Sequence, residues 1–371
     1  MAEPIRVCQV VGNMMGGGVE HVVMNYFEHV DHEKVQFDFV VTQSSIVVPR
    51  EQIEAGGGRI FTVPGYMNLL AFESALYGLF CEHPEWRIVH SHMNALSVFP
   101  LRQAAKVGVP VRIAHSHSAF GYGEPVRNAA KLFLRRFANK YPTDRFACSR
   151  AAGDWLFGEG TSYEVVYNAI DLDRFAFDPS VRAAVRVELG ISEDSFVVGH
   201  VGRFMQTKNQ GFLVDAFARM LAARPGSLLV FAGTGEDEAA VRGRADGLGI
   251  SERVLFLGQR EDSNRLYQAF DVVALPSLYE GLGLVAIEAQ AAGLPCLLSD
   301  RIPDEADLTG QCCYLAIDSA QEWADALASL QPRSDAQRAA RDHGDFAHYD
   351  IGEQAAWLTN RYLELFEGAA R

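Results

Sequence analysis

The sequence lacks the features that would place this chain across a membrane, in an oxidising compartment or on a nucleic acid. It contains no run of about 18 consecutive apolar residues, the length that a membrane-spanning helix needs. Its six cysteines form no Cys-x-x-Cys pair, so we expect reduced cysteines and no disulfide framework. Acidic residues outnumber basic ones by 47 to 33, and the net charge of −14 argues against a nucleic-acid partner.

The N-terminus also lacks the basic segment that precedes the apolar core of a signal peptide, so we expect a cytoplasmic protein. With 49% apolar and 22% charged residues, the composition is ordinary for a globular chain. A length of 371 residues favours two domains.

The charge is distributed unevenly along the chain. Residues 1–170 contain 15 basic and 16 acidic residues, whereas residues 171–371 contain 18 and 31. Within the nearly neutral first part, residues 126–150 hold seven basic residues and one acidic residue. A local basic block in an acidic protein indicates a surface that meets an anionic partner.

Short apolar segments alternate with amphipathic ones, which is typical of mostly parallel sheets with helices on both faces. One series of predicted strands runs from residues 5–11 to 164–167, and a second begins at 196–201. We therefore predict an α/β fold of two tandem doubly wound, Rossmann-like domains that face a cleft. The predicted domains are residues 1–168 and 169–348. The remaining residues 349–371 form a C-terminal helix, for which crossing back to the first domain is one option.

Ligands of open α/β sheets bind beyond the carboxyl ends of the strands. The first predicted strand is followed there by Gly16-Gly17-Gly18 and a helix, so an anion could approach the backbone amides closely. The loop lacks both the third glycine of the dinucleotide fingerprint and the Lys-Ser/Thr of a P-loop. We interpret it as a phosphate or sugar contact, and a tight turn without a ligand is the alternative.

Another predicted strand, residues 109–115, ends in two histidines within the segment Val111–Ser118. Alternation along an extended chain places His115 and His117 on the same side. We interpret them as polar groups of an active site. A capping or core role and a two-histidine metal site are alternatives, and no third metal ligand has a convincing spacing. His90 and His92 form a similar pair one strand earlier, which we interpret as structural support.

Two basic residues, Arg203 and Lys208, follow the first strand of the second predicted domain, close to a helix N-terminus. A forked guanidinium and a point-charged ammonium at such a turn suit a diphosphate. A solvated surface pair is the alternative.

The clearest signal lies between a predicted strand and the helix after it. Glu280 follows the strand, Gly281-Leu282-Gly283 forms a turn with amides open to phosphate, and Glu288 lies in the helix among apolar residues. A carboxylate in apolar surroundings is costly unless it is paired or hydrogen-bonded. Two vicinal hydroxyls of a sugar or a ribose would satisfy Glu288.

This segment resembles the signature of the retaining glycosyltransferases of family 4, which have the GT-B fold. Further positions match the family in order, so the resemblance extends over nearly the whole chain: Gly17–Glu20, Val166–Asp171, Arg203, Lys208 and Glu288–Pro295. Within the family the chain is most similar to the bacterial exopolysaccharide and capsule-type enzymes, a likeness carried by Ala114–His117, Arg203–Asn209 and Ser299–Pro303. It departs from the family at Ala169, where glycine is usual.

The resemblance implies a role for each candidate residue. Glu288 would bind the ribose of a nucleotide sugar, and Glu280 would bind hydroxyls of the donor sugar. Arg203 and Lys208 would neutralise the leaving diphosphate. His117 would contact the sugar near its anomeric carbon, with His115 as the second choice. The donor would also be lined by glycines and by one leucine: Gly17, Gly18, Gly281, Leu282 and Gly283.

The implied activity is retaining, hexosyltransferase-type transfer from a nucleotide sugar, with UDP as the favoured nucleotide. The acceptor would be a hydroxyl of a glycan or of a polyprenyl-diphosphate-linked sugar, in exopolysaccharide, capsule or cell-surface glycan synthesis. We expect no cofactor and no metal, because we identify no Asp-x-Asp metal motif of the kind that other transferases carry. The resemblance leaves open whether Glu280 acts as a nucleophile or the acceptor attacks from the front face. A nucleotide-sugar epimerase on the same fold and a catalytically silent, donor-binding partner subunit are the alternatives.

The basic block coincides with a predicted amphipathic helix over residues 126–141. Arg127, Lys131 and Lys140 flank its apolar stripe, and Arg135 and Arg136 add further charge. Such a helix suits an anionic membrane surface, and therefore peripheral attachment at the inner face of the cell membrane. A core-facing helix with solvated basic residues is the alternative.

Overall fold

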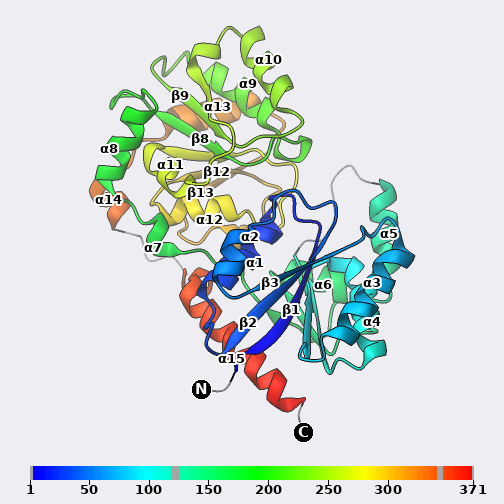
Figure 1. Cartoon of the computed structure of the whole chain (residues 1–371). Helices are drawn as coiled ribbons and strands as arrows, with labels where there is room; N and C mark the ends of the chain where they lie inside the picture. The colour runs from blue at the N-terminus through cyan, green and yellow to red at the C-terminus, as the bar shows by residue number, and fades with distance from the viewer. Residues whose placement is uncertain (1–2, 118–124, 341–345, 370–371) are drawn as a thin grey trace. The chain divides into compact units, whose positions relative to one another are not determined.

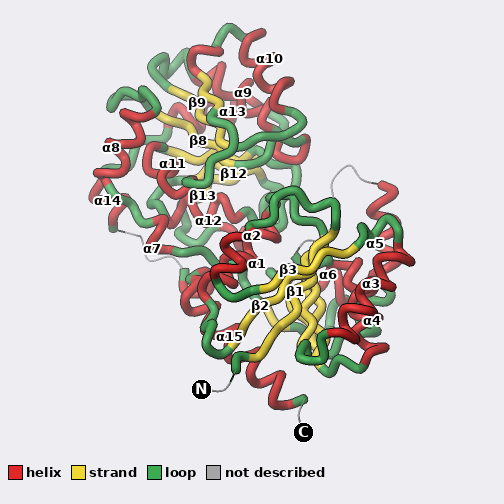
Figure 2. Tube along the Cα trace, in the orientation of Figure 1, coloured by secondary structure: helices red, strands yellow, loops and turns green. Residues whose placement is uncertain are grey.

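The computed structural model describes residues 3–117, 125–340 and 346–369. The chain folds into two units (Figure 1). Unit 1 comprises Met1–Ile170 together with Ala347–Arg371, and unit 2 comprises Asp171–Phe346. In each unit a parallel sheet lies among helices (Figure 2). The predicted fold class of two Rossmann-like α/β domains is confirmed.

Unit 1 is built on a seven-stranded sheet with the order β3-β2-β1-β4-β5-β6-β7. Its strands are β1 (Ile5–Gly12), β2 (Val35–Thr42), β3 (Arg59–Val63), β4 (Ile88–Ser91), β5 (Val111–Ser116), β6 (Asp144–Ala147) and β7 (Glu164–Val165). Its α-helices are α1 (Gly18–His29), α2 (Arg50–Ala55), α3 (Leu69–Glu82), α4 (Val98–Val107), α5 (Pro125–Arg135), α6 (Arg150–Phe157) and α15 (Ile351–Gly368), and short 3-10 turns are η1 (Asn94–Ser97) and η5 (Ala347–Tyr349).

Unit 2 is built on a six-stranded sheet with the order β10-β9-β8-β11-β12-β13. Its strands are β8 (Val197–Val201), β9 (Leu228–Ala232), β10 (Val254–Phe256), β11 (Val272–Leu275), β12 (Cys296–Ser299) and β13 (Cys312–Leu315). Its α-helices are α7 (Leu172–Phe175), α8 (Pro179–Glu188), α9 (Gln210–Met220), α10 (Glu238–Gly247), α11 (Ser263–Ala269), α12 (Leu284–Ala291), α13 (Ala320–Ser329) and α14 (Asp335–Ala339), and its 3-10 turns are η2 (Gln206–Lys208), η3 (Ser251–Arg253) and η4 (Asp304–Ala306).

The strand order places a switch point in each sheet, where the chain reverses the direction in which it adds strands. It lies between β1 and β4 in unit 1 and between β8 and β11 in unit 2. Ligands of doubly wound sheets bind at such points, beyond the carboxyl ends of the strands. The loops after these four strands are therefore the first places to look for a site.

The central strands are mostly apolar because helices cover both faces of a parallel sheet. All eight residues of β2 are buried, including Asp38. Burial alone would raise the pKa of the Asp38 carboxyl, but hydrogen bonds from Arg6, Arg59 and Trp86 outweigh it and hold that pKa below its usual value. The one acid inside β2 is thus fully paired, as a buried charge requires.

The sequence prediction placed the end of one helix too late and missed one strand. The predicted helix over 126–141 ends as α5 at Arg135, because i→i+3 bonds take over: Phe137 N–H donates to Leu134 and Ala138 N–H to Arg135. The pattern also did not predict β13, whose residues are only partly buried, so its apolar signal is weak.

Helix α15 packs within unit 1, beside α1 and β2 (Figure 1). The return of the chain is fixed by backbone hydrogen bonds from Ile170 N–H to Tyr349 and from Ile351 N–H to Ile170, 2.8 and 3.0 Å long. Tyr362 on α15 is fully buried and reaches polar side chains of β1 and β4. The last helix is thus part of the core of unit 1.

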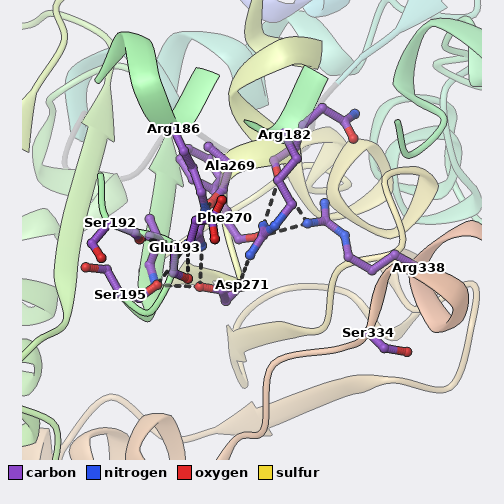
Figure 3. Close-up of polar contacts among 12 residues, drawn as sticks. Arg182, Arg186, Ser192, Glu193, Ser195, Ala269, Phe270, Asp271, Ser334 and Arg338 are labelled. Atoms are coloured by element: carbon purple, nitrogen blue, oxygen red, sulfur yellow. Dashed lines mark hydrogen bonds and ion pairs between the residues drawn. The ribbon is translucent and has the colours of Figure 1, made fainter. Parts of the chain in front are cut away.

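A buried group of charges joins α8, β11 and α14 at the amino end of the unit 2 sheet (Figure 3). Asp271, directly before β11, accepts from Arg182 at 2.7 Å, from Arg186 at 2.8 Å and from the backbone N–H of Val197 at 2.8 Å. Arg338 donates to the backbone carbonyls of neighbouring segments, and burial lowers its pKa to about 9. This group lies at the end of the sheet where the strands begin, opposite the end that carries the loops after β8 and β11.

Candidate functional site

The loops that follow β8 and β11 bring a lysine and a glutamate together at the switch point of unit 2. Lys208, in η2, places its ammonium 2.5 Å from Oε1 of Glu280. The hydroxyl of Ser277 donates to the same oxygen at 2.7 Å. A backbone bond of 2.8 Å from Leu278 N–H to the carbonyl of Thr207 ties the two loops together. The structure thus joins two predicted site residues that are 72 positions apart.

Arg203 also follows β8, but its guanidinium pairs with a different carboxylate from the one that Lys208 contacts. It contacts the carboxylate of Glu236 at 3.1 Å, and both side chains are more than half exposed. An exposed ion pair contributes little free energy, so Arg203 can exchange Glu236 for an anionic ligand at small cost. The structure does not place Arg203 against Glu280.

Glu288 lies in α12 with its carboxylate buried, as predicted from its apolar neighbours. The hydroxyl of Tyr267 donates to Oε2 of Glu288 at 2.6 Å. Burial raises the pKa of the Glu288 carboxyl to about 7, against the opposing effects of Tyr267 and of Arg174. Sequence reasoning identified Glu288 but missed Tyr267, which lies on a different helix, α11.

The turn before α12 is anchored by its middle residue. Leu282 is buried, and Gly283 adopts a left-handed conformation with φ of 83°. A Cβ atom at Gly283 would lie 3.2 Å from a methyl of Ile302, so a side chain there would meet both strain and contact. Gly281 is partly exposed. The buried side chain of Leu282 therefore holds the turn in place, and the two glycines leave its backbone uncovered by side chains of their own.

His200, on β8, is a polar residue that sequence analysis did not single out. Its Nδ1 donates to the carbonyl of Ala274 at 2.9 Å, so Nε2 carries the lone pair. That nitrogen is buried and has no hydrogen-bond partner among the described residues. Burial lowers the pKa of His200 to about 4. A Cβ atom on Gly202 would lie 3.7 Å from His200 Nε2 and 3.9 Å from Lys208 Cε, so both side chains lie next to Gly202.

In unit 1, the glycine loop after β1 leads into α1 as predicted. Gly17 is the residue before the helix, and both Gly17 and Gly18 are exposed. A Cβ atom at Gly18 would meet nothing within 4 Å. The backbone N–H of Gly17, however, is hydrogen-bonded to the carboxylate of Glu20. An anion at this amide would have to displace that carboxylate, whereas the Gly18 side of the loop is open.

His115 and His117 lie on the same side of their strand, which confirms the prediction. Their rings stack with centroids 3.9 Å apart. The backbone N–H of His117 donates to the side chain of Asn94 at 2.6 Å, and Asn94 adopts a left-handed backbone with φ of 50°. Ser118, the last residue of that motif, lies outside the described residues.

The second histidine pair adjoins the first. His90 Nε2 lies 3.1 Å from His115 Nδ1, and His92 Nδ1 lies 2.9 Å from His117 Nε2. All four rings are buried. Burial lowers the pKa of His117 to about 3 and those of the other three well below the usual value. The imidazoles are therefore neutral near pH 7.

Three of these rings have the proximity that a metal ion requires. One nitrogen each of His90, His92 and His115 lies within 4.8 Å of the others, a set that sequence spacing did not reveal. Yet His90 and His92 use both ring nitrogens in hydrogen bonds. A metal ion would have to break these bonds, so the cluster fits a hydrogen-bonded network better.

Asp171 and Asp173 do have the Asp-x-Asp spacing, although sequence analysis identified no such motif. The structure assigns Asp171 a local task. Its carboxylate accepts from the backbone N–H groups of Asp173 and Arg174 and so caps α7. Capping is a common role of aspartate at this position.

The basic block lies on and after α5. Arg135 is partly buried and donates to the carbonyl of Asp154 at 3.2 Å, whereas Arg136 and Lys140 are exposed. Lys131 is partly exposed, and the Arg127 side chain lies outside the described part of the structure. Apolar side chains accompany these charges at the surface: Leu132, Phe133 and Phe137 are 44%, 58% and 36% exposed. The stripe is thus not buried over its whole length.

No helix in the described part of the chain combines the length and the apolar character needed to cross a bilayer.

Comparison with known proteins agrees with the geometry. A family model described as Glycosyltransferase Family 4 matches residues 16–174, and one described as Glycosyl transferases group 1 matches residues 181–338. EpsF from Bacillus subtilis (strain 168), which is named a glycosyltransferase, is 36% identical over 310 residues, covering 81% of each chain. The UDP-Gal:alpha-D-GlcNAc-diphosphoundecaprenol alpha-1,3-galactosyltransferase of Escherichia coli is 28% identical over 318 residues, covering 80% of this chain and 79% of that protein.

Solved structures share the fold at lower identity. HepE from Anabaena, in complex with UDP and glucose, gives a TM-score of 0.76 at 19% identity and covers 97% of this chain and 99% of its own. WaaG, a glycosyltransferase involved in lipopolysaccharide biosynthesis, gives 0.72 at 18% identity, with the same coverage. Together with the family models and the similarity to EpsF, these findings identify the chain as a glycosyltransferase that belongs to family 4, with the GT-B fold, in its exopolysaccharide-type subgroup.

Proposed function

We propose that this glycosyltransferase moves a sugar from a uridine diphosphate donor to an acceptor hydroxyl, with retention at the anomeric carbon and without a metal. The observation that carries the proposal is the Lys208–Glu280 pair at the switch point of unit 2, with buried Glu288 on the helix that follows. This set offers a cation for a phosphate and two carboxylates for hydroxyls. HepE was crystallised with UDP and glucose, and with UDP-glucose, which supports the choice of nucleotide.

In this proposal the diphosphate becomes more negative as the bond to the sugar breaks. The Lys208 ammonium, the Arg203 guanidinium and the amides of Gly281 and Gly283 stabilise that charge without reorganising. Glu280 holds donor-sugar hydroxyls, and Glu288 accepts from the ribose. In unit 1, Gly17, Gly18 and His117 contact the donor as well. The leaving phosphate oxygen takes the proton of the attacking acceptor hydroxyl, so no metal or further base is needed.

The acceptor is proposed to be a glycan or a polyprenyl-diphosphate-linked sugar used in exopolysaccharide synthesis. The galactosyltransferase of Escherichia coli acts, by its name, on a diphosphoundecaprenol acceptor, which supports a lipid-linked substrate. Proton NMR of the product, formed in the presence of a chelator, tests the reaction. An α-linked product from an α-linked donor is expected. An inverted product, a requirement for metal, or release of an epimerised nucleotide sugar without acceptor would contradict the proposal.

The buried carboxyl of Glu288 predicts a pH-dependent stability in the ligand-free protein. Its pKa of about 7 exceeds the value of about 4.3 for an unfolded chain. The native state therefore keeps a proton that the unfolded state releases between these values, and the protein loses stability as pH rises to about 7. Glu288→Gln should melt several degrees above wild type at pH 8 and at the same temperature near pH 4.

The exposed Glu252 provides the matched control, since Glu252→Gln should leave the melting temperature within a degree or so at both pH values. The affinity of the wild type for UDP should rise with pH through about 7, because the ionised carboxylate accepts both ribose hydroxyls. An equal melting temperature for Glu288→Gln and wild type across pH 4–8 would rule out this account of Glu288.

We further propose that the surface around α5 binds anionic membranes. Leu132, Phe133 and Phe137 supply the apolar contact, and Arg136 and Lys140 supply the charge, since all five are exposed. In vesicle flotation, wild type should be retained by vesicles containing phosphatidylglycerol. The double variant Phe133→Ser/Phe137→Ser should reduce the bound fraction about tenfold or more, because two apolar rings no longer leave water.

Val187→Ser, on α8, is the control for this experiment because Val187 is 81% exposed and lies outside the basic block. It should bind vesicles as wild type does. Equal retention by neutral vesicles, or no retention at all, would show that the α5 surface does not bind anionic membranes.

A further inference from the structure

The four buried histidines of unit 1 belong to one continuous chain of hydrogen bonds, which we call the histidine chain. It consists, in order, of His117, His92, Gln9, Tyr362, His90 and His115. Successive side chains are joined by contacts of 2.9, 2.8, 3.2, 2.6 and 3.1 Å. All six residues are buried. The chain connects β1, β4 and the end of β5 to the C-terminal helix α15.

Gln9 fixes the positions of the protons on one side. Its amide oxygen can only accept, so His92 Nε2, 2.8 Å away, is a donor. A neutral imidazole has one N–H, which leaves His92 Nδ1 as an acceptor. His117 Nε2 must then donate to it. His117 consequently carries its proton on Nε2 and a lone pair on Nδ1.

The proton positions on His90 and His115 follow in the same way. The amide nitrogen of Gln9 donates to the hydroxyl oxygen of Tyr362, and that hydroxyl donates to His90 Nδ1. His90 therefore carries its proton on Nε2 and donates to Nδ1 of His115. His115 keeps its own proton on Nε2. All five bonds run in one direction, so each polarises the next.

The two ends of the histidine chain are the two ring nitrogens left without a partner. His117 Nδ1 and His115 Nε2 are buried and have no hydrogen-bond partner among the described residues. The first is an acceptor and the second a donor, on rings stacked 3.9 Å apart. A ligand hydroxyl both donates and accepts, and therefore complements such a pair.

We propose that Gln9, Tyr362 and His90 are positioning residues that set the tautomers of His117 and His115, so that these rings offer a donor-sugar hydroxyl one acceptor and one donor. The inference rests on the proposed function, because it takes the hydroxyl to be that of the donor sugar. The histidine chain orients dipoles and does not conduct a proton from end to end, since the amide of Gln9 cannot pass one on without changing its bonding. Helix α15 contributes Tyr362 to the histidine chain.

The tautomers can be measured in the ligand-free, full-length protein. Histidine-selective ¹⁵N labelling with long-range ¹H–¹⁵N correlation distinguishes Nε2–H from Nδ1–H rings, and single His→Gln variants assign the signals. We expect all four rings to be neutral with the proton on Nε2. Protons on Nδ1, a charged ring near pH 7, or a retained metal ion bound to the rings would each overturn the proposal.

Tyr362→Phe and Tyr26→Phe form a matched pair of variants. Both tyrosines are buried and line the same small cavity, but the Tyr26 hydroxyl donates to the backbone carbonyl of Tyr167 at 2.7 Å, outside the histidine chain. Tyr362→Phe removes the donor to His90. It should shift the His90 and His115 nitrogen signals and lower kcat about tenfold, with the Kd for UDP within about twofold of wild type.

Tyr26→Phe should leave the tautomers and kcat unchanged. Equal loss of kcat in both variants, or unshifted histidine signals in Tyr362→Phe, would overturn the positioning role. The tautomer spectrum needs no substrate, so it separates this inference from the proposed function. If the spectrum is as expected but UDP does not bind, the proposed function alone fails.

Discussion

Replacement of Lys208 by methionine is expected to lower kcat by about a hundredfold to a thousandfold. The Lys208 ammonium is the partly buried cation at the switch point of unit 2, and in the proposed reaction it faces the departing diphosphate. Removal of one preorganised charge-stabilising group at a reacting centre typically costs this much. Initial rates with saturating donor and acceptor measure the effect, and the melting temperature shows whether the variant is folded.

Lys34→Met is the matched control, because Lys34 forms an exposed ion pair with Asp31 at 2.7 Å in unit 1. Its kcat should equal that of wild type. A second comparison is Ser277→Ala, which removes a hydrogen bond to Glu280 but keeps the ammonium and should cost about tenfold or less. If Lys208→Met keeps more than a tenth of the wild-type kcat, Lys208 does not stabilise the leaving group.

Replacement of Asp271 by asparagine should lower the free energy of unfolding of unit 2 by about 3–5 kcal/mol. Asp271 is the carboxylate shared by Arg182 and Arg186 (Figure 3). Arg186 is almost fully buried. Loss of the Asp271 charge leaves the buried Arg186 guanidinium without its ion-pair partner, which costs more than the loss of a surface pair. Urea denaturation followed by circular dichroism provides the measurement.

Asp215→Asn gives the contrast, since Asp215 pairs with Arg244 at the surface of the same unit and the Arg244 side chain is 52% exposed. That change should cost about 1 kcal/mol or less. Similar losses for the two variants would mean that the charges around Asp271 are solvated and do not hold the sheet edge.

Much of the candidate site in unit 2 could be predicted because its residues lie in short, ordered motifs. Glu280 and Glu288 are separated by one glycine-rich turn. The sequence pattern predicts the strand before this turn and the helix after it. The depth of Glu288 was also predictable from its apolar neighbours. The direct contact between Lys208 and Glu280 was not, because no local pattern reports which loops meet at a switch point.

The hydrogen bonds of the histidine chain could not be predicted from the sequence. Gln9 and Tyr362 are 353 positions apart, and neither belongs to a recognisable motif. Their contact depends on the return of α15 to unit 1, a tertiary event decided by packing. Similarly, the end of α5 at Arg135 depends on local i→i+3 bonds that helical periodicity does not reveal.

In the proposed function, unit 2 binds a uridine diphosphate sugar through Glu288 without a metal. Thermal-shift measurements with UDP, GDP, ADP and their sugar derivatives, in the presence of a chelator, test it most directly. A ligand that binds the native state raises the melting temperature by mass action. We expect UDP and one UDP-sugar to raise the melting temperature of wild type, and Glu288→Ala to abolish the shift. No shift with any nucleotide at millimolar concentration, a shift that needs a divalent metal, or an undiminished shift in Glu288→Ala would contradict metal-free binding through Glu288.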